Sequence, residues 1–151
     1  MSLLVKRRSA NNSLKFPETI HPLLRHVYSR RNIASVDELQ LGLEHLIPPG
    51  KLKGMEAAIE LLMDALHRQL RVLIVADFDA DGATSCALGI TALRQMGYKH
   101  VDYIVPNRFD YGYGLTAEIV ELAKTKSPDL IITVDNGISS IDGVAAATAA
   151  G

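Results

Sequence analysis

The sequence contains one cysteine, Cys86, no tryptophan and few aromatic residues, which make up 5% of its 151 residues. A lone cysteine cannot form a disulfide within the chain, and a cysteine-based zinc site needs several Cys or His ligands at set spacings. No run approaches the roughly 18–20 consecutive apolar residues of a membrane span. These absences predict a cytoplasmic protein that works in a reducing compartment and does not cross a membrane.

The remaining composition is that of an ordinary globular protein. Apolar residues make up 48% of the chain and charged residues 22%, which excludes fibrous and intrinsically disordered classes. The net charge of −1 hides an asymmetry, because residues 1–71 carry 11 basic and 7 acidic residues, whereas residues 72–151 carry 5 and 10. A basic first part and an acidic second part suggest a polyanion-binding face beside a cation-binding site, although a chance fluctuation explains the counts equally well.

The first 70 residues read as helical. Apolar residues at helical spacing predict one helix over residues 17–31 and another over the segment GMEAAIELLMDALHRQL, with Pro48, Pro49 and Gly50 breaking the chain between them. Residues 1–70 are therefore predicted to be an N-terminal helical extension.

From residue 71 the pattern changes to short apolar runs separated by helix-length segments. VLIVA at 72–76, VDYIV at 101–105 and LIITV at 130–134 are predicted strands, with helices at about 82–96 and 116–126 between them. Continuous apolar strands about 29 residues apart are typical of a parallel sheet covered on both faces. The predicted fold class is α/β, a parallel sheet with helices on both faces.

The predicted domain is incomplete at its carboxyl end. A third helix begins near Ser139 or Ser140 and reaches Gly151, at the point where another strand is expected. Residues 71–151 are accordingly predicted to be the first part of a larger domain.

Three aspartates, Asp77, Asp79 and Asp81, follow the first predicted strand within five residues. Such carboxylates repel one another unless a cation lies among them. Ligands bind at the carboxyl ends of parallel strands, and oxygen-rich sites suit Mg²⁺ or Mn²⁺. Two other interpretations remain. The segment opens like an EF-hand loop but has Leu88 where that loop needs a glutamate, and the aspartates could simply cap the next helix, Asp81 being nearest the cap.

A fourth aspartate, Asp135, follows the third predicted strand. Before Asn-Gly, such a residue is more often a turn former than a ligand. It lies at the same level of the sheet as the first cluster, however, so Asp79, Asp81 and Asp135 could converge on one site. Two metal ions sharing a bridging carboxylate could there activate a water and stabilise the oxygens of a phosphoryl displacement.

The segment PNRFDYGYGLT, residues 106–116, follows the middle strand and is predicted to be an irregular loop. Its Asn107 and Arg108 offer hydrogen-bond donors for a substrate phosphate. An ion pair of Arg108 on the surface, with Asp110 for example, is the alternative. GYGLTA also matches a dinucleotide-binding pattern, but its glycines lie too far from the strand for that motif.

The three motifs VADFDADGATS, VPNRFDYGYGLT and LIITVDNGISS, in this order on successive strands, closely resemble the RecJ family of bacterial single-strand-specific DNA exonucleases in the DHH phosphoesterase superfamily. The resemblance spans residues 70–151. It implies an enzyme that degrades single-stranded DNA in the 5′→3′ direction with Mg²⁺ or Mn²⁺, in recombination and repair. Single-strand-binding protein is an implied partner, and the basic N-terminal part would help form a DNA channel.

The same resemblance assigns roles to individual residues. Asp77, Asp79, Asp81 and Asp135 would be metal ligands, with Asp135 shared between two metals, and Asp79, Asp81 and Asp135 would form the catalytic set. Asn107 and Arg108 would bind a substrate phosphate.

The chain also departs from the family pattern. Val75 and Ala76 stand where some members carry a ligating histidine, and the Asp-His-His motif of the superfamily is missing. We therefore expect this chain alone to be inactive. The remaining alternatives are a phosphoesterase that acts on short oligonucleotides, cyclic dinucleotides or pyrophosphate, and a non-catalytic metal- or nucleic-acid-binding module.

Overall fold

The computed structural model describes residues 6, 8–10, 13–31 and 33–151, which form two units, residues 1–52 and 53–151. Among its described residues, the first unit has one short α-helix followed by three short 3₁₀ helices: α1 (Pro22–Tyr28), η1 (Val36–Leu39), η2 (Leu43–His45) and η3 (Pro49–Lys51). The helix predicted over residues 17–31 is thus shorter than expected. It begins at Pro22 because the side chain of His21 accepts a hydrogen bond from the Leu23 amide, and a proline is favoured in the first turn.

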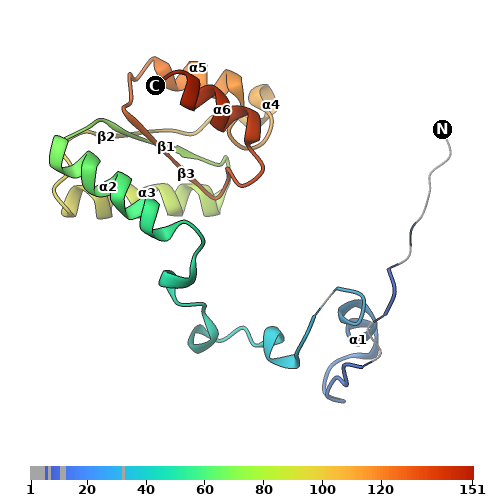
Figure 1. The fold of residues 1–151 in the computed structure, drawn as a ribbon. Helices are drawn as coiled ribbons and strands as arrows, with labels where there is room; N and C mark the ends of the chain where they lie inside the picture. Colours follow the sequence, from blue (N-terminus) through green and yellow to red (C-terminus); the bar gives the residue numbers. More distant parts are fainter. Residues whose placement is uncertain (1–5, 7, 11–12, 32) are drawn as a thin grey trace, which may run out of the picture. The chain divides into compact units, whose positions relative to one another are not determined.

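The second unit alternates helices and strands (Figure 1). Its elements are α2 (Met55–Arg68), β1 (Val72–Ala76), α3 (Ala80–Gln95), β2 (Val101–Ile104), α4 (Arg108–Tyr111), α5 (Ala117–Lys124), β3 (Leu130–Val134) and α6 (Ile141–Ala149). Helix α2, which we assigned to the N-terminal extension, lies in this unit. Within the part of the chain that the structure describes, no helix has the length and hydrophobicity to traverse a lipid bilayer.

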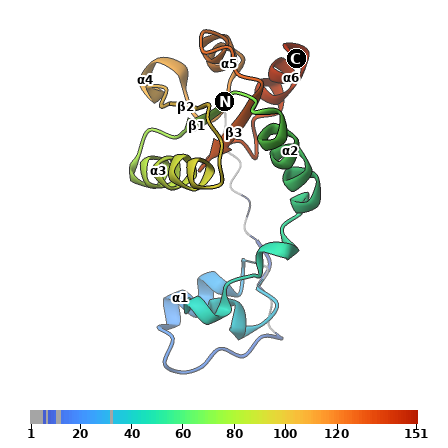
Figure 2. The same cartoon turned by 90° about the vertical axis from the view of Figure 1, so that its left-hand side faces the viewer.

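The three strands form one parallel sheet in the order β2-β1-β3, so that β1 is central. Val72 of β1 is in register with Val101 of β2 and with Leu130 of β3. Helices α2 and α3 cover one face of the sheet, and α5 and α6 cover the other (Figures 1 and 2). The predicted α/β class, with a parallel sheet covered on both faces, is confirmed.

The central strand supplies the core on both faces, and its five residues are all buried. Val72, Ile74 and Ala76 pack in one cluster with residues of α2 and α3, and Leu73 and Val75 pack in a second cluster with residues of α5. This alternation follows from the two-residue period of a strand. Because both faces of β1 are fixed by packing, the position of its carboxyl end is fixed as well.

Two local features differ from the sequence-based expectation. Helix α3 begins at Ala80, about two residues early, because Asp79 is its N-cap and accepts a hydrogen bond from the Gly82 amide at 3.0 Å. Asp81, which we placed nearest the cap, lies in the first turn. The expected irregular loop after β2 contains the one-turn helix α4, which Asn107 caps.

Candidate metal centre

The sheet order places a topological switch point at the carboxyl ends of β1 and β3. The chain passes from β1 to β2 on one side and then returns across β1 to β3 on the other. The segments that follow these adjacent strands therefore leave toward opposite faces, α3 covering one and α6 the other (Figure 2). In open parallel α/β sheets, such a topological switch point is where ligands bind.

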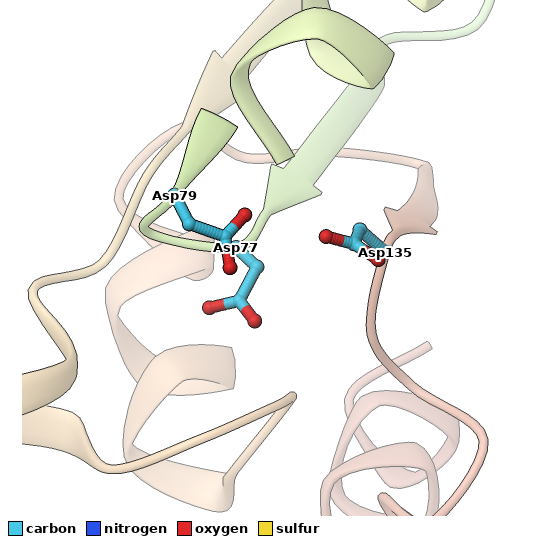
Figure 3. A group of neighbouring side chains, drawn as sticks. All are labelled: Asp77, Asp79 and Asp135. Carbon is cyan, nitrogen blue, oxygen red and sulfur yellow. The ribbon is translucent and has the colours of Figure 1, made fainter. Parts of the chain in front are cut away.

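Three carboxylates lie close together at this switch point. One oxygen from each of Asp77, Asp79 and Asp135 lies within 4.8 Å of the others, and the side chains face one another from the two strand ends (Figure 3). The last paired residues, Ala76 and Val134, are in register, so Asp77 and Asp135 each follow a strand at the same level. The structure does not bring Asp81 into this group of three.

The loop that carries Asp77 and Asp79 is tightly closed. The Asp77 carboxylate accepts a hydrogen bond from the amide of Phe78 at 2.7 Å, and that of Asp79 caps α3. Gly82 lies directly against this loop, because a Cβ atom there would stand 2.2 Å from the Asp77 carbonyl oxygen. A glycine at 82 is therefore what allows the helix to start so close to the strand end.

Replacement of Gly82 with alanine is expected to lower the free energy of unfolding by about 1–3 kcal/mol. The new Cβ atom would overlap with backbone atoms of Asp77, which cannot rotate away as a side chain can. Chemical denaturation followed by circular dichroism measures the change. Gly89→Ala is the matched control in the same helix, since its Cβ would meet no backbone atom and only the terminal methyl group of the buried Ile74 side chain, at 3.0 Å. Equal stability of the two variants would contradict the interpretation.

Asp135 is held in an uncommon backbone conformation. Its φ of 59° lies in the left-handed region, as does the φ of 104° at Gly137. Asn136 between them donates from its side-chain amide to the carbonyl oxygens of Val75, at 3.3 Å, and Val134, at 3.1 Å. The chain thus bends at Asp135 directly after β3, and the turn itself follows at residues 138–139. The bend carries Asp135 toward the other carboxylates.

Arg108 reaches the same carboxylates from α4. Its guanidinium contacts Asp77 and Asp79 at 3.0 Å each and lies 4.9 Å from the ring centroid of Tyr113. The Arg108 side chain is 21% exposed, so the ion pair is partly enclosed. Arg108 does form an ion pair, as the alternative interpretation expected, but its partners are Asp77 and Asp79, which lie 31 and 29 residues away in the sequence. Asp110 instead accepts a hydrogen bond from Asn107.

Asn107 has a local role. Its side-chain oxygen accepts a hydrogen bond from the Phe109 amide at 3.0 Å, and its amide donates to Asp110 at 2.8 Å. Asn107 therefore caps α4 and fixes the turn from which Arg108 extends.

Neighbouring groups stabilise the negative charge of Asp79 but not that of Asp135. The Gly82 amide and the Arg108 guanidinium lower the pKa of Asp79. The pKa of Asp135 is raised by its partial removal from water and by the negative charges of Asp79, Asp81 and Asp77. Repulsion is therefore concentrated on Asp135, and a divalent cation there would relieve it. Three carboxylates form an oxygen donor set that fits Mg²⁺ or Mn²⁺.

The sequence places this arrangement among known proteins. Residues 71–151 match the N-terminal domain of the DHH family. The chain belongs to the DHH family. The strands that carry Asp77, Asp79 and Asp135 all lie inside the matched DHH domain.

Relatives of this DHH chain include single-stranded-DNA-specific exonucleases RecJ. The one from Haemophilus influenzae is 48% identical over 147 residues, covering 96% of this chain and 25% of the relative, and the one from Escherichia coli is 44% identical over 140 residues, covering 93% and 24%. A crystal structure of exonuclease RecJ bound to manganese is 35% identical with a TM-score of 0.55, covering 62% of this chain and 24% of that one. The predicted resemblance to RecJ is confirmed, and the chain spans about a quarter of the length of these relatives.

Sequence reasoning missed three residues of this DHH site. The sequence motifs include Gly82 and Tyr113 but do not indicate their contacts. Gly82 packs against the backbone of Asp77, and Tyr113 lies against the Arg108 guanidinium. Asn136 was read as part of a turn, and its side-chain contact with Val75 lies 61 residues away in sequence. No local pattern indicates that contact.

Proposed function

We propose that this chain is part of a metal-dependent exonuclease that hydrolyses phosphodiester bonds of single-stranded DNA in the 5′→3′ direction, in recombination and repair. The observation that carries the proposal is the cluster of Asp77, Asp79 and Asp135 at the switch point of a DHH domain, beside Arg108. Relatives that are RecJ exonucleases, one of them bound to manganese, support the substrate class and the metal.

In this proposal Asp77, Asp79 and Asp135 would be ligands of Mg²⁺ or Mn²⁺, and Asp135 would be the ligand shared by two ions. Asp81, in the first turn of α3, stays a predicted further ligand. Divalent ions at this position supply Lewis acidity and lower the pKa of a bound water. Asp135 approaches from β3 and the pair Asp77 and Asp79 from β1, so the sheet presets the spacing of the carboxylates.

Arg108 is the proposed phosphate-binding residue, and Asn107 assists by fixing α4. The guanidinium carries donors that match phosphate oxygens, and its ion pairs to Asp77 and Asp79 hold it against the carboxylate cluster. A phosphate bound there would lie beside the cluster. Single-strand-binding protein is a proposed partner and the cytoplasm the proposed location. The division of the chain after residue 70 likewise stays a prediction.

The experiment that tests this proposal compares two proteins on 5′-labelled single-stranded oligonucleotides with Mn²⁺. We expect the full-length product of the gene to release nucleotides from the 5′ end and the 151-residue chain to release none, because the chain lacks the Asp-His-His motif. A full-length protein that cleaves only dinucleotides or pyrophosphate would contradict the substrate class. Degradation by the 151-residue chain that Asp135→Ala abolishes would contradict the expected inactivity.

A further inference from the structure

Asn136 joins the ends of the two strands that carry the carboxylates. Its side-chain amide donates to the carbonyl oxygen of Val134, directly before Asp135, and to that of Val75, two residues before Asp77. One side chain thus connects the backbone of β1 with that of β3 next to the last registered pair, Ala76 and Val134.

The chemistry of this contact requires a neutral amide. Two carbonyl oxygens are two acceptors, and an asparagine amide offers two N–H donors on one nitrogen, whereas an aspartate offers none. The Asn136 side-chain oxygen is enclosed and has no hydrogen-bond partner among the described residues. The hydrogen bonds of this side chain within the described residues are therefore the two that its amide donates to the strand ends.

The contact acts on Asp135 through the backbone. Asp135 adopts a φ of 59°, which is unfavourable for a residue with a side chain. Its neighbours fix it there, because Asn136 is hydrogen-bonded to both strands and Gly137 packs so closely that a Cβ would stand 2.4 Å from the Thr133 hydroxyl oxygen. The Asp135 carboxylate is consequently held toward those of Asp77 and Asp79.

We propose that Asn136 is a positioning residue that sets the distance between the Asp135 carboxylate and those of Asp77 and Asp79, and thereby the affinity for a divalent cation. The inference rests on the proposed function, in that it takes the cluster to be a metal site. Removal of outer contacts that orient metal ligands typically weakens metal binding by about 10–100-fold.

Gln69 provides a matched control for a purely structural role. Its side-chain amide also donates to two backbone carbonyl oxygens, those of Leu66 at 2.8 Å and Gly97 at 3.3 Å. It lies before β1, at the opposite end of the strands from the carboxylates. Loss of Gln69 therefore removes the same kind of contact, together with a hydrogen bond that its side-chain oxygen accepts from the Lys99 amide at 3.2 Å, without touching the site.

The test measures Mn²⁺ affinity by electron paramagnetic resonance, and thermal stability, on the 151-residue chain and its Asn136→Ala and Gln69→Ala variants. Both variants are expected to unfold at lower temperature, but only Asn136→Ala is expected to bind Mn²⁺ about 10–100-fold more weakly. Asn136→Ser, which keeps one hydroxyl donor, is expected to bind with intermediate affinity and provides the comparison if the alanine variant does not fold.

The outcomes separate this inference from the proposed function. Wild-type affinity in Asn136→Ala, or in Asn136→Ser where only that variant folds, overturns the positioning role alone. An equal loss of affinity in Gln69→Ala also overturns it, because the effect would then follow from stability. A wild-type chain that binds no Mn²⁺ at all overturns both this inference and the metal site on which it rests.

Discussion

Asp135→Asn in the full-length protein is expected to reduce the rate of single-stranded DNA hydrolysis on the order of 10²–10³-fold or more, since it removes the one carboxylate that β3 contributes to the proposed metal site. Asparagine is the informative replacement because it tolerates the left-handed conformation found at this position. Initial rates at saturating Mn²⁺ measure the effect. Asp64→Asn, an exposed change on α2, is the control and is expected to leave the rate unchanged.

Thermal unfolding of the same variant distinguishes a catalytic from a structural role. The pKa of Asp135 is raised by partial removal from water and by the charges of Asp79, Asp81 and Asp77. The negatively charged carboxylate is therefore less favourable in the folded state than in the unfolded state. Without added metal, Asp135→Asn is therefore expected to be at least as stable as the wild type, while the stabilisation by Mn²⁺ is lost. A variant that is less stable yet hydrolyses DNA at the wild-type rate would favour the non-catalytic module.

Arg108→Ala in the full-length protein is expected to raise the KM for single-stranded DNA on the order of tenfold, because it removes the proposed phosphate contact. Salt dependence gives a second measure. For single strands, each phosphate contact contributes about 0.7 to the slope of log affinity against log salt concentration, so the variant should lose about that much. Binding titrations at several salt concentrations check this.

Two further variants sharpen the interpretation of Arg108. Lys124→Ala removes an exposed ion pair with Glu121 on α5 and is expected to change neither KM nor the salt slope. Arg108→Lys keeps the charge but not the forked geometry, so a partial recovery is expected. An Arg108→Ala protein with reduced stability and an unchanged salt slope would show that Arg108 serves only as the ion-pair partner of Asp77 and Asp79.

The sequence allowed accurate prediction of the fold where hydrophobic pattern and local structure agree. Strands β1 and β3 match their predicted bounds because both are unbroken apolar runs. The one-turn helix α4 was missed because four residues carry no helical period, and Asn107 as a capping residue was its only signal. Among the aspartates, the choice of Asp79 over Asp81 as the cap depends on how sharply the chain turns at Gly82, which the sequence does not state.

The sequence predicted that Asp77, Asp79 and Asp135 lie near one another, but it included Asp81 as well and did not indicate the contacts within the candidate site. Parallel topology alone places Asp77, Asp79 and Asp135 at one edge of the sheet. Asp77 and Asp79, the ion-pair partners of Arg108, and Val75, one of the two partners of Asn136, lie 29–61 residues away, so only the completed strand order determines these contacts. The contacts between side chains from different strand ends are set by the tertiary structure.

The register between β1 and β3 limits how this protein can change in length. A strand advances about 3.3 Å per residue, a distance comparable with the 4.8 Å within which the three carboxylates gather. Inserting or deleting one residue in β3 would move Asp135 by that amount relative to Asp77, or would turn every β3 side chain to the other face of the sheet. Changes of length during evolution are therefore expected to gather in the connections before the strands, such as the segment around Gly97, and to spare the strands that end at the carboxylates.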